Sequence, residues 1–270
     1  MRRAPRVAGL AAIAALTLAG ARGGATPAPA AIEVFAAASL GDAFKELARH
    51  FERAHAGVAV RLNFGGSQQL AAQIEQGAAA DVFASADDRW SGELADRGLL
   101  DGAPTVFARN RLIVAVPKTN PARISRLQDL ARGGVKVVIG ADVVPVGHYT
   151  RESLAKLAHQ PGFDPSYAHR VLANVVSEEE NVKSVLAKVQ LGEADAGFVY
   201  RSDVTPTLAH FVRTFEIPDS ANVLAAYPIA LVRDGKQAES ARAFVALVLS
   251  ADGQQVLERH GLIPVAPVTP

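Results

Sequence analysis

The sequence contains no cysteine, and this absence excludes several classes of structure and chemistry. No disulfide can stabilise the fold, and no thiolate can act as a nucleophile or bind a metal ion. A lipid anchor on cysteine is excluded as well, because Ala21 stands where the lipidated residue would follow Leu18, Ala19 and Gly20. The fold must therefore be stabilised by the burial of apolar side chains.

The chain also lacks an excess of charge of either sign. Its 28 Lys and Arg residues nearly balance its 27 Asp and Glu residues, which leaves a formal net charge of +1. No basic run appears beyond the N-terminal residues, whereas nucleic-acid-binding surfaces are strongly basic. We therefore expect no nucleic-acid partner.

Residues 1–30 have the pattern of a secretory signal peptide followed by a lead-in segment. Arg2 and Arg3 precede an uncharged apolar run over residues 7–19, and small residues suited to cleavage follow at 19–21 and at 28–30. An apolar run this short favours a cleaved signal peptide over the alternative, an uncleaved membrane anchor. The sequence thus predicts a mature protein in the periplasm, with no membrane insertion after signal cleavage.

Strand-like and helix-like apolar spacings alternate along the rest of the chain. Apolar residues at helical spacing include Phe44, Leu47 and Phe51, and a last amphipathic helix contains Phe244 and Val248. The predicted strands cover residues 32–37, 58–64, 81–86, 112–116, 135–139, 171–176, 196–200 and 227–232. This alternation predicts an α/β fold of parallel sheets with helices on both faces.

This number of strands fits two doubly wound α/β domains better than one open sheet. Turn-rich stretches near residues 108–110 and 220–222 are the candidate crossings between the domains. We therefore predict a discontinuous domain I, residues 31–109 plus 225–270, and a domain II, residues 110–224. A two-stranded hinge would join them.

Four turns place small or hydroxyl residues between a predicted strand and the following helix. They lie around Ser39, around Ser67, around Val146 and over residues 177–182. A helix N-terminus presents unpaired N–H groups and a partial positive charge, which suits an anion. Each turn alone is more often a simple cap, but their repetition in both predicted domains indicates an anion site between the domains.

Two of these turns have capping-box spacing. Ser39 and Asp42 are predicted to form one such box. In the fourth turn, either Ser177 and Glu180 form a box or Asn181 caps the helix, and we favour Asn181 because asparagine is a strong cap. The three glutamates at 178–180 would repel an anion, so we expect them to point into solvent.

From residue 32 to residue 265 the chain resembles the periplasmic molybdate-binding proteins of ABC importers, which are type II periplasmic solute-binding proteins. The most specific segments are VFAAASL at 34–40 and the pattern LAxQIExGA at 70–78. Supporting segments are the Ser67 turn, ADVFASAD at 80–87, PVGHY at 145–149 and GFVYRSD at 197–203. The resemblance implies the two-domain fold of that family.

In that family two domains close on a dehydrated tetrahedral dianion, held by hydroxyl and main-chain N–H groups. The resemblance therefore implies five binding residues: Ser39, Ser67, Val146, Val182 and Tyr200. The serines would supply hydroxyl and N–H groups, the valines main-chain N–H groups, and Tyr200 its phenol. Molybdenum would be bound only as molybdate, through these same residues, and no cofactor is expected.

The implied function is high-affinity binding of molybdate or tungstate by a monomer that delivers the anion to an ABC transporter permease. The alternative is another tetrahedral oxyanion such as sulfate. A hydrolase or transferase using Ser39 and His148, with Asp203 as third member, is disfavoured because no nucleophile elbow is present. The effector domain of a transcription regulator can share this architecture, but the signal peptide argues against it.

Other polar residues near these turns have ordinary structural explanations. We expect His148 to be a partly exposed loop residue. Asp81, Asp87 and Asp88 do not have the spacing of metal ligands, so helix-capping and turn roles are expected for them.

Overall fold

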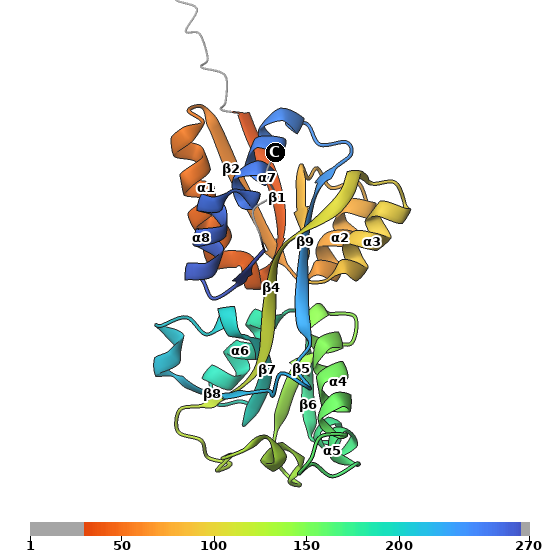
Figure 1. Cartoon of the computed structure of the whole chain (residues 1–270), viewed down its shortest axis with the longest axis vertical. Coiled ribbons are helices and arrows are strands. Elements are labelled where there is room, and N and C mark those ends of the chain that lie inside the picture. The colour runs from red at the N-terminus through yellow and green to blue at the C-terminus, as the bar shows by residue number, and fades with distance from the viewer. Residues whose placement is uncertain (1–29, 266–270) are drawn as a thin grey trace, which may run out of the picture.

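The computed structural model describes residues 30–265, which form two α/β lobes stacked end to end (Figure 1). Two paired antiparallel strands, β4 (Leu100–Pro117) and β9 (Leu224–Val232), connect the lobes. The predicted signal peptide and lead-in lie outside the described residues, apart from Ala30. Within residues 30–265, no helix has the length and apolar character needed to cross a bilayer.

Lobe I is built on three parallel strands, in the order β2-β1-β3, with β9 antiparallel beside β3. Helices α1, α7 and α8 pack together on one face of this sheet, and α2 and α3 pack on the other (Figure 1). The remaining elements of lobe I are β1 (Ala30–Ala37), η1 (Ala38–Leu40), α1 (Gly41–Ala54), β2 (Val58–Gly65), α2 (Ser67–Glu75), β3 (Val82–Ala84), α3 (Asp88–Asp96), α7 (Ala238–Leu249), α8 (Ala251–Arg259) and β10 (Ile263–Pro264).

Lobe II repeats this plan. Strands β7, β5 and β6 are parallel, while β4 runs antiparallel to both β7 and β8. Its elements are η2 (Leu127–Ala131), β5 (Val137–Gly140), α4 (Pro145–Leu157), α5 (Tyr167–Ala173), β6 (Val175–Glu179), α6 (Val182–Gln190), β7 (Ala196–Tyr200), η3 (Arg201–Asp203), η4 (Leu208–His210) and β8 (Val212–Glu216). The predicted doubly wound α/β class is confirmed, although the connecting strands are antiparallel to their neighbours.

Several parts of the secondary structure differ from the prediction, among them strand β8, which was not predicted. Residues 171–173 end helix α5 and the strand begins only at Val175, because a short apolar run does not distinguish a buried helix from a strand. Strand β4 begins at Leu100 rather than 112, and its first half contains two register shifts that obscure the alternation. Helix α8 was not predicted; the Ser250 side chain accepts a hydrogen bond from Gly253 N (3.1 Å) at its start.

The predicted apolar face of α1 is confirmed. Phe44, Leu47 and Phe51 are completely buried. The Phe44 ring lies 5.8 Å from the ring of Phe107 on β4 and 6.0 Å from that of Phe244 on α7. This cluster joins the beginning of lobe I to its C-terminal helices.

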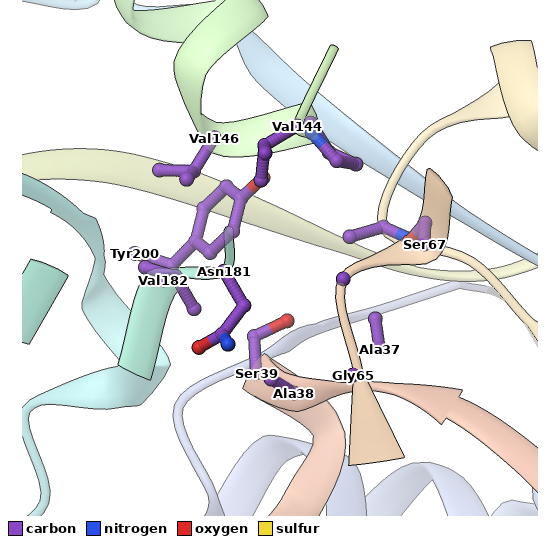
Figure 2. A pocket seen from close by; sticks show the side chains of 13 residues that line it. Ala37, Ala38, Ser39, Gly65, Ser67, Val144, Val146, Asn181, Val182 and Tyr200 are labelled. Atoms are coloured by element: carbon purple, nitrogen blue, oxygen red, sulfur yellow. The ribbon is translucent and has the colours of Figure 1, made fainter. Parts of the chain in front are cut away.

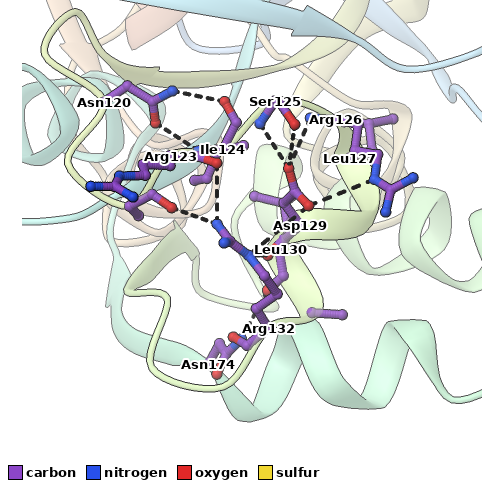
Figure 3. A network of polar contacts seen from close by, with 12 residues as sticks. Asn120, Arg123, Ile124, Ser125, Arg126, Leu127, Asp129, Leu130, Arg132 and Asn174 are labelled. Atoms are coloured by element: carbon purple, nitrogen blue, oxygen red, sulfur yellow. Dashed lines mark hydrogen bonds and ion pairs between the residues drawn. The ribbon is translucent and has the colours of Figure 1, made fainter.

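A polar network orders the long connection between β4 and β5 (Figure 3). The Asp129 carboxylate accepts hydrogen bonds from the Ser125 N–H (2.8 Å) and hydroxyl (2.9 Å) groups. Asn120 has a positive φ of 48°, and its side chain pairs with both backbone groups of Ile124. Asn174, after α5, donates to the Arg132 carbonyl (2.7 Å). These contacts stabilise the end of lobe II that is remote from lobe I.

Replacing Phe44 with alanine should lower the free energy of unfolding by about 3–5 kcal/mol, because the cavity cannot be refilled by the rigid rings around it. Urea denaturation measures the loss. The matched control is Phe211→Ala, since the Phe211 side chain is 50% exposed and its loss should cost much less. Equal losses for the two variants would contradict the packing described above.

Candidate functional site

The five predicted binding residues line one pocket between the lobes (Figure 2). The pocket encloses about 220 Å³ of empty space, its opening included. The residues that line it are Ala37, Ala38, Ser39, Gly65, Gly66, Ser67, Ala86, Val144, Pro145, Val146, Asn181, Val182 and Tyr200. No charged side chain is among them, so the pocket offers only neutral groups to a ligand.

Ser67 is the first residue of α2 and is almost completely buried. Its hydroxyl oxygen accepts a hydrogen bond from the backbone N–H of Ala86 (3.0 Å). A backbone N–H can only donate, so the hydroxyl keeps its own hydrogen for another partner. Ser67 is therefore fixed as a donor toward the pocket.

Ser39 does not form the predicted capping box with Asp42. Residues 38–40 form the short helix η1, and α1 begins at Gly41 without a side-chain cap. The Ser39 hydroxyl instead makes a hydrogen bond with the hydroxyl of Tyr227 on β9 (2.9 Å). The prediction of a cap was wrong because a buried long-range partner competes for the same oxygen.

Tyr200 ends β7 with its side chain 1% exposed. Within residues 30–265 its hydroxyl oxygen has no hydrogen-bond partner. Burial raises the pKa of the Tyr200 phenol well above its usual value, so the group keeps its proton at physiological pH. The pocket therefore contains a protonated hydroxyl without a partner, which is costly in a protein interior.

Two helices of lobe II begin at the pocket. In α6 the Asn181 side chain accepts from Ser184 N (3.1 Å), so asparagine is the cap and the first N–H, that of Val182, is not used by it. In α4 the N–H of Val146 lies in the first turn, where no intrahelical acceptor is available. Both N–H groups belong to the set that a helix N-terminus offers to an anion.

The expectation that the three glutamates point into solvent holds only in part. Glu178 and Glu180 are exposed, whereas the Glu179 side chain is 12% exposed and forms an ion pair with Lys188 (2.7 Å). Glu178 pairs with Arg151 (2.6 Å). Sequence spacing did not reveal these cations, which neutralise two of the carboxylates beside the pocket.

The lobes contact each other around the pocket. Gln68 donates to the Glu180 carbonyl (2.8 Å) and Gln69 to the Glu180 carboxylate (2.6 Å). A side chain at Gly66 would overlap the same Glu180 carbonyl, which explains the glycine. On the other side, Trp90 donates from its indole nitrogen to the Val143 carbonyl (3.1 Å). Polar contacts thus join the lobes on two sides of the pocket.

The residues considered for catalysis are not arranged for it. Among the described residues, no hydrogen bond joins Ser39 to His148, which is exposed on α4 and does not line the pocket. Asp203 is buried, where it accepts from Tyr200 N (3.0 Å) and pairs with Lys183 (3.1 Å). Within residues 30–265 no group of three or more acidic or histidine side chains could hold a metal ion.

The chain is similar to known proteins over most of its length. Residues 32–263 match the family described as bacterial extracellular solute-binding protein. The molybdate-binding protein ModA of Mycobacterium tuberculosis is 40% identical over 255 residues, which are 94% of this chain and 93% of that protein. The solved periplasmic molybdate-binding protein of Azotobacter vinelandii superposes with a TM-score of 0.75 at 20% identity, covering 87% of this chain and all of that one. The solved sulfate-binding protein SubI of Mycobacterium tuberculosis superposes with a TM-score of 0.78 at 17% identity, covering 88% of each.

Asp87 caps α3 directly after the pocket residue Ala86, and burial raises the pKa of its carboxyl to about 6. Because the unfolded chain releases this proton near its ordinary pKa of about 4, the ionised carboxyl destabilises the fold increasingly as the pH rises from about 4 through 6. Asp87→Asn keeps an acceptor for Trp90 N. It should raise the free energy of unfolding by about 2–3 kcal/mol at pH 8, and this gain should vanish near pH 4.

Urea denaturation at several pH values tests this expectation. Asp88→Asn is the control, because Asp88 is exposed and its replacement should change stability little. A gain for Asp87→Asn that is the same at every pH would rule out ionisation as its cause.

Proposed function

This chain belongs to the bacterial extracellular solute-binding proteins, and on that premise we propose that it binds molybdate or tungstate in the pocket between its lobes. It would then deliver the anion to the membrane permease of an ABC importer. The 40% identical relative that covers 94% of the chain is a molybdate-binding protein. The neutral, donor-lined pocket supports an oxyanion ligand independently of that relationship.

The observation that carries the proposal is the Tyr200 hydroxyl. It is buried in the pocket wall with no partner among residues 30–265, and such a group costs about 1–3 kcal/mol. A ligand oxygen in the pocket would remove this cost. Ser39, Ser67, Val146 and Val182 would complete the binding set with two hydroxyl and several main-chain N–H groups.

The pocket selects by the protonation state of its ligand. Molybdate, tungstate and sulfate are dianions without protons near neutral pH, so each of their oxygens can accept. Hydrogen phosphate keeps a proton, which would face donors and leave an unsatisfied pair. Sulfate passes this test, so the cavity size has to separate it from the larger molybdate and tungstate.

Within the described part of the chain, residues 31–109 with 225–265 and residues 110–224 would move as two rigid bodies. This proposal is supported by β4, whose backbone pairs with β9 up to Arg111 and with β7 from Leu112. The connecting strands would then bend between residues 109 and 112 and near residue 224. We expect the processed protein to act as a periplasmic monomer without enzymatic activity.

Titration calorimetry of the ligand-free protein with molybdate, tungstate, sulfate and phosphate tests the ligand. Each hydrogen bond to a charged ligand contributes roughly 1.5–3 kcal/mol, and part of the sum is lost to association. We expect micromolar to nanomolar affinity for molybdate and tungstate, and much weaker binding of sulfate and phosphate. Tighter binding of sulfate than of molybdate would contradict the assigned ligand, and hydrolysis of any ester would contradict a receptor.

Tyr200→Phe should weaken molybdate binding about 10- to 100-fold, because one donor to the anion is lost. The same variant should leave the ligand-free protein at least as stable, because the lost hydroxyl has no partner. Tyr167→Phe is the matched control with the opposite outcome. The Tyr167 hydroxyl is buried and donates to the Leu127 carbonyl (2.7 Å) far from the pocket, so its loss should lower stability and keep affinity. Equal affinities of the two variants would remove Tyr200 from the site.

A further inference from the structure

We propose that Asn110 and Tyr227 fix the direction of hydrogen bonding at Ser39, so that this hydroxyl only donates into the pocket and protonated anions are rejected. Neither residue lines the pocket. Both are positioning residues that would act through Ser39. The proposal rests on the proposed function, because it concerns the ligand selectivity of the same pocket.

The chain of hydrogen bonds begins at Asn110, which is completely buried on β4. Its carbonyl oxygen accepts from the backbone N–H of Arg111 (2.9 Å). Because a backbone N–H can only donate, this contact fixes which end of the amide is oxygen. The amide nitrogen therefore faces the other two partners, the hydroxyl groups of Ser202 (2.8 Å) and Tyr227 (3.3 Å), and donates one hydrogen to each.

The bond from Asn110 determines how Tyr227 bonds to Ser39. Its hydroxyl accepts from Asn110 and has a single hydrogen of its own. Within residues 30–265, its one other hydrogen-bond partner is Ser39 (2.9 Å), so Tyr227 donates to Ser39. Burial raises the pKa of the Tyr227 phenol well above its usual value, which keeps that hydrogen in place at physiological pH.

Ser39 can therefore hydrogen-bond toward the pocket only as a donor. Its oxygen accepts from Tyr227, and its hydrogen is free on the pocket side, where Figure 2 shows the Ser39 hydroxyl. Ser67 reaches the same state by a shorter route, through the backbone N–H of Ala86. The two serines that line the pocket, both in lobe I, are thus set as donors: Ser67 by the main chain and Ser39 by two side chains.

This arrangement has a consequence for selectivity. A free serine hydroxyl can rotate to accept from a protonated ligand, whereas a hydroxyl whose oxygen already accepts a hydrogen bond has a strong bias to donate. Fully deprotonated dianions would match such a pocket at every oxygen. Hydrogen phosphate or hydrogen arsenate would bring its proton to hydroxyls that are already oriented as donors, which leaves a poorly matched pair.

Asn110→Asp tests the direction of the chain. The aspartate keeps the acceptor for Arg111 N but replaces the amide nitrogen with a second acceptor. Tyr227 should then donate to the carboxylate, Ser39 should donate to Tyr227, and a Ser39 lone pair should face the pocket. The new negative charge weakens the binding of every anion, so the readout is a ratio: the dissociation constant of phosphate divided by that of molybdate. We expect calorimetry near neutral pH to show that ratio falling at least about 100-fold.

Tyr227→Phe is the second variant, because it breaks the chain without adding charge. It frees Ser39 to rotate, and the same ratio should fall about tenfold. Ser202→Ala is the matched control: it removes the other acceptor of Asn110 and leaves the chain to Ser39 intact, so the ratio should stay at the wild-type value. If the substitutions only destabilise the protein, the free energy of unfolding should fall in all three variants while the ratio of dissociation constants stays at the wild-type value.

Wild-type ratios in both Asn110→Asp and Tyr227→Phe would overturn the proposal. A failure of this proposal can be distinguished from a failure of the molybdate assignment. If the wild-type protein prefers sulfate, the molybdate assignment fails, and the ratio of phosphate to sulfate tests the hydrogen-bond chain in the same variants. If the wild-type protein binds phosphate as tightly as the deprotonated dianions, the chain does not select.

Discussion

A dianion enclosed between two protein lobes loses its water, and every hydrogen bond that water made has to be replaced by a protein donor. The pocket meets this requirement with neutral groups alone. Three helices, α2, α4 and α6, begin at its wall, and their first N–H groups have no partner within their own helices. A lysine or arginine would attract many anions, whereas neutral donors in fixed positions favour a ligand of matching shape and protonation.

The sheet topology brings these donors together. Strands β1 and β2 of lobe I and β7 of lobe II all end at the pocket, where their last residues give way to helices. The antiparallel strands β4 and β9 make this arrangement possible, because they carry the chain straight from one lobe to the other. Asn110 and Tyr227 lie on these strands, so the connection between the lobes also supports the pocket.

Much of the site was predictable from the sequence because its signals are local. A strand followed by a small residue and a helix marks the turns of Ser39 and Ser67, and the capping preference of asparagine identified Asn181. The roles of Val146, Val182 and Tyr200 came from the resemblance to the family. The partners of these residues could not be predicted in this way. Ser39 and Tyr227 are 188 positions apart, and only the folded sheet makes them neighbours. For the same reason the ion pair of Glu179 was not predicted, and the antiparallel path of β4 was concealed by its two irregularities.

The contact between the lobes involves both favourable and unfavourable effects. With the lobes together, the Tyr200 hydroxyl is buried without a partner among residues 30–265, which opposes this arrangement by about 1–3 kcal/mol. The contacts of Gln68 and Gln69 with Glu180 favour closure, but they are exposed and polar and therefore weak. Because these two effects have opposite signs, a ligand that binds only when the lobes are together would shift the balance toward that arrangement. An anion that accepts from the Tyr200 hydroxyl would remove this cost, so the same hydroxyl would couple the approach of the lobes to ligand binding.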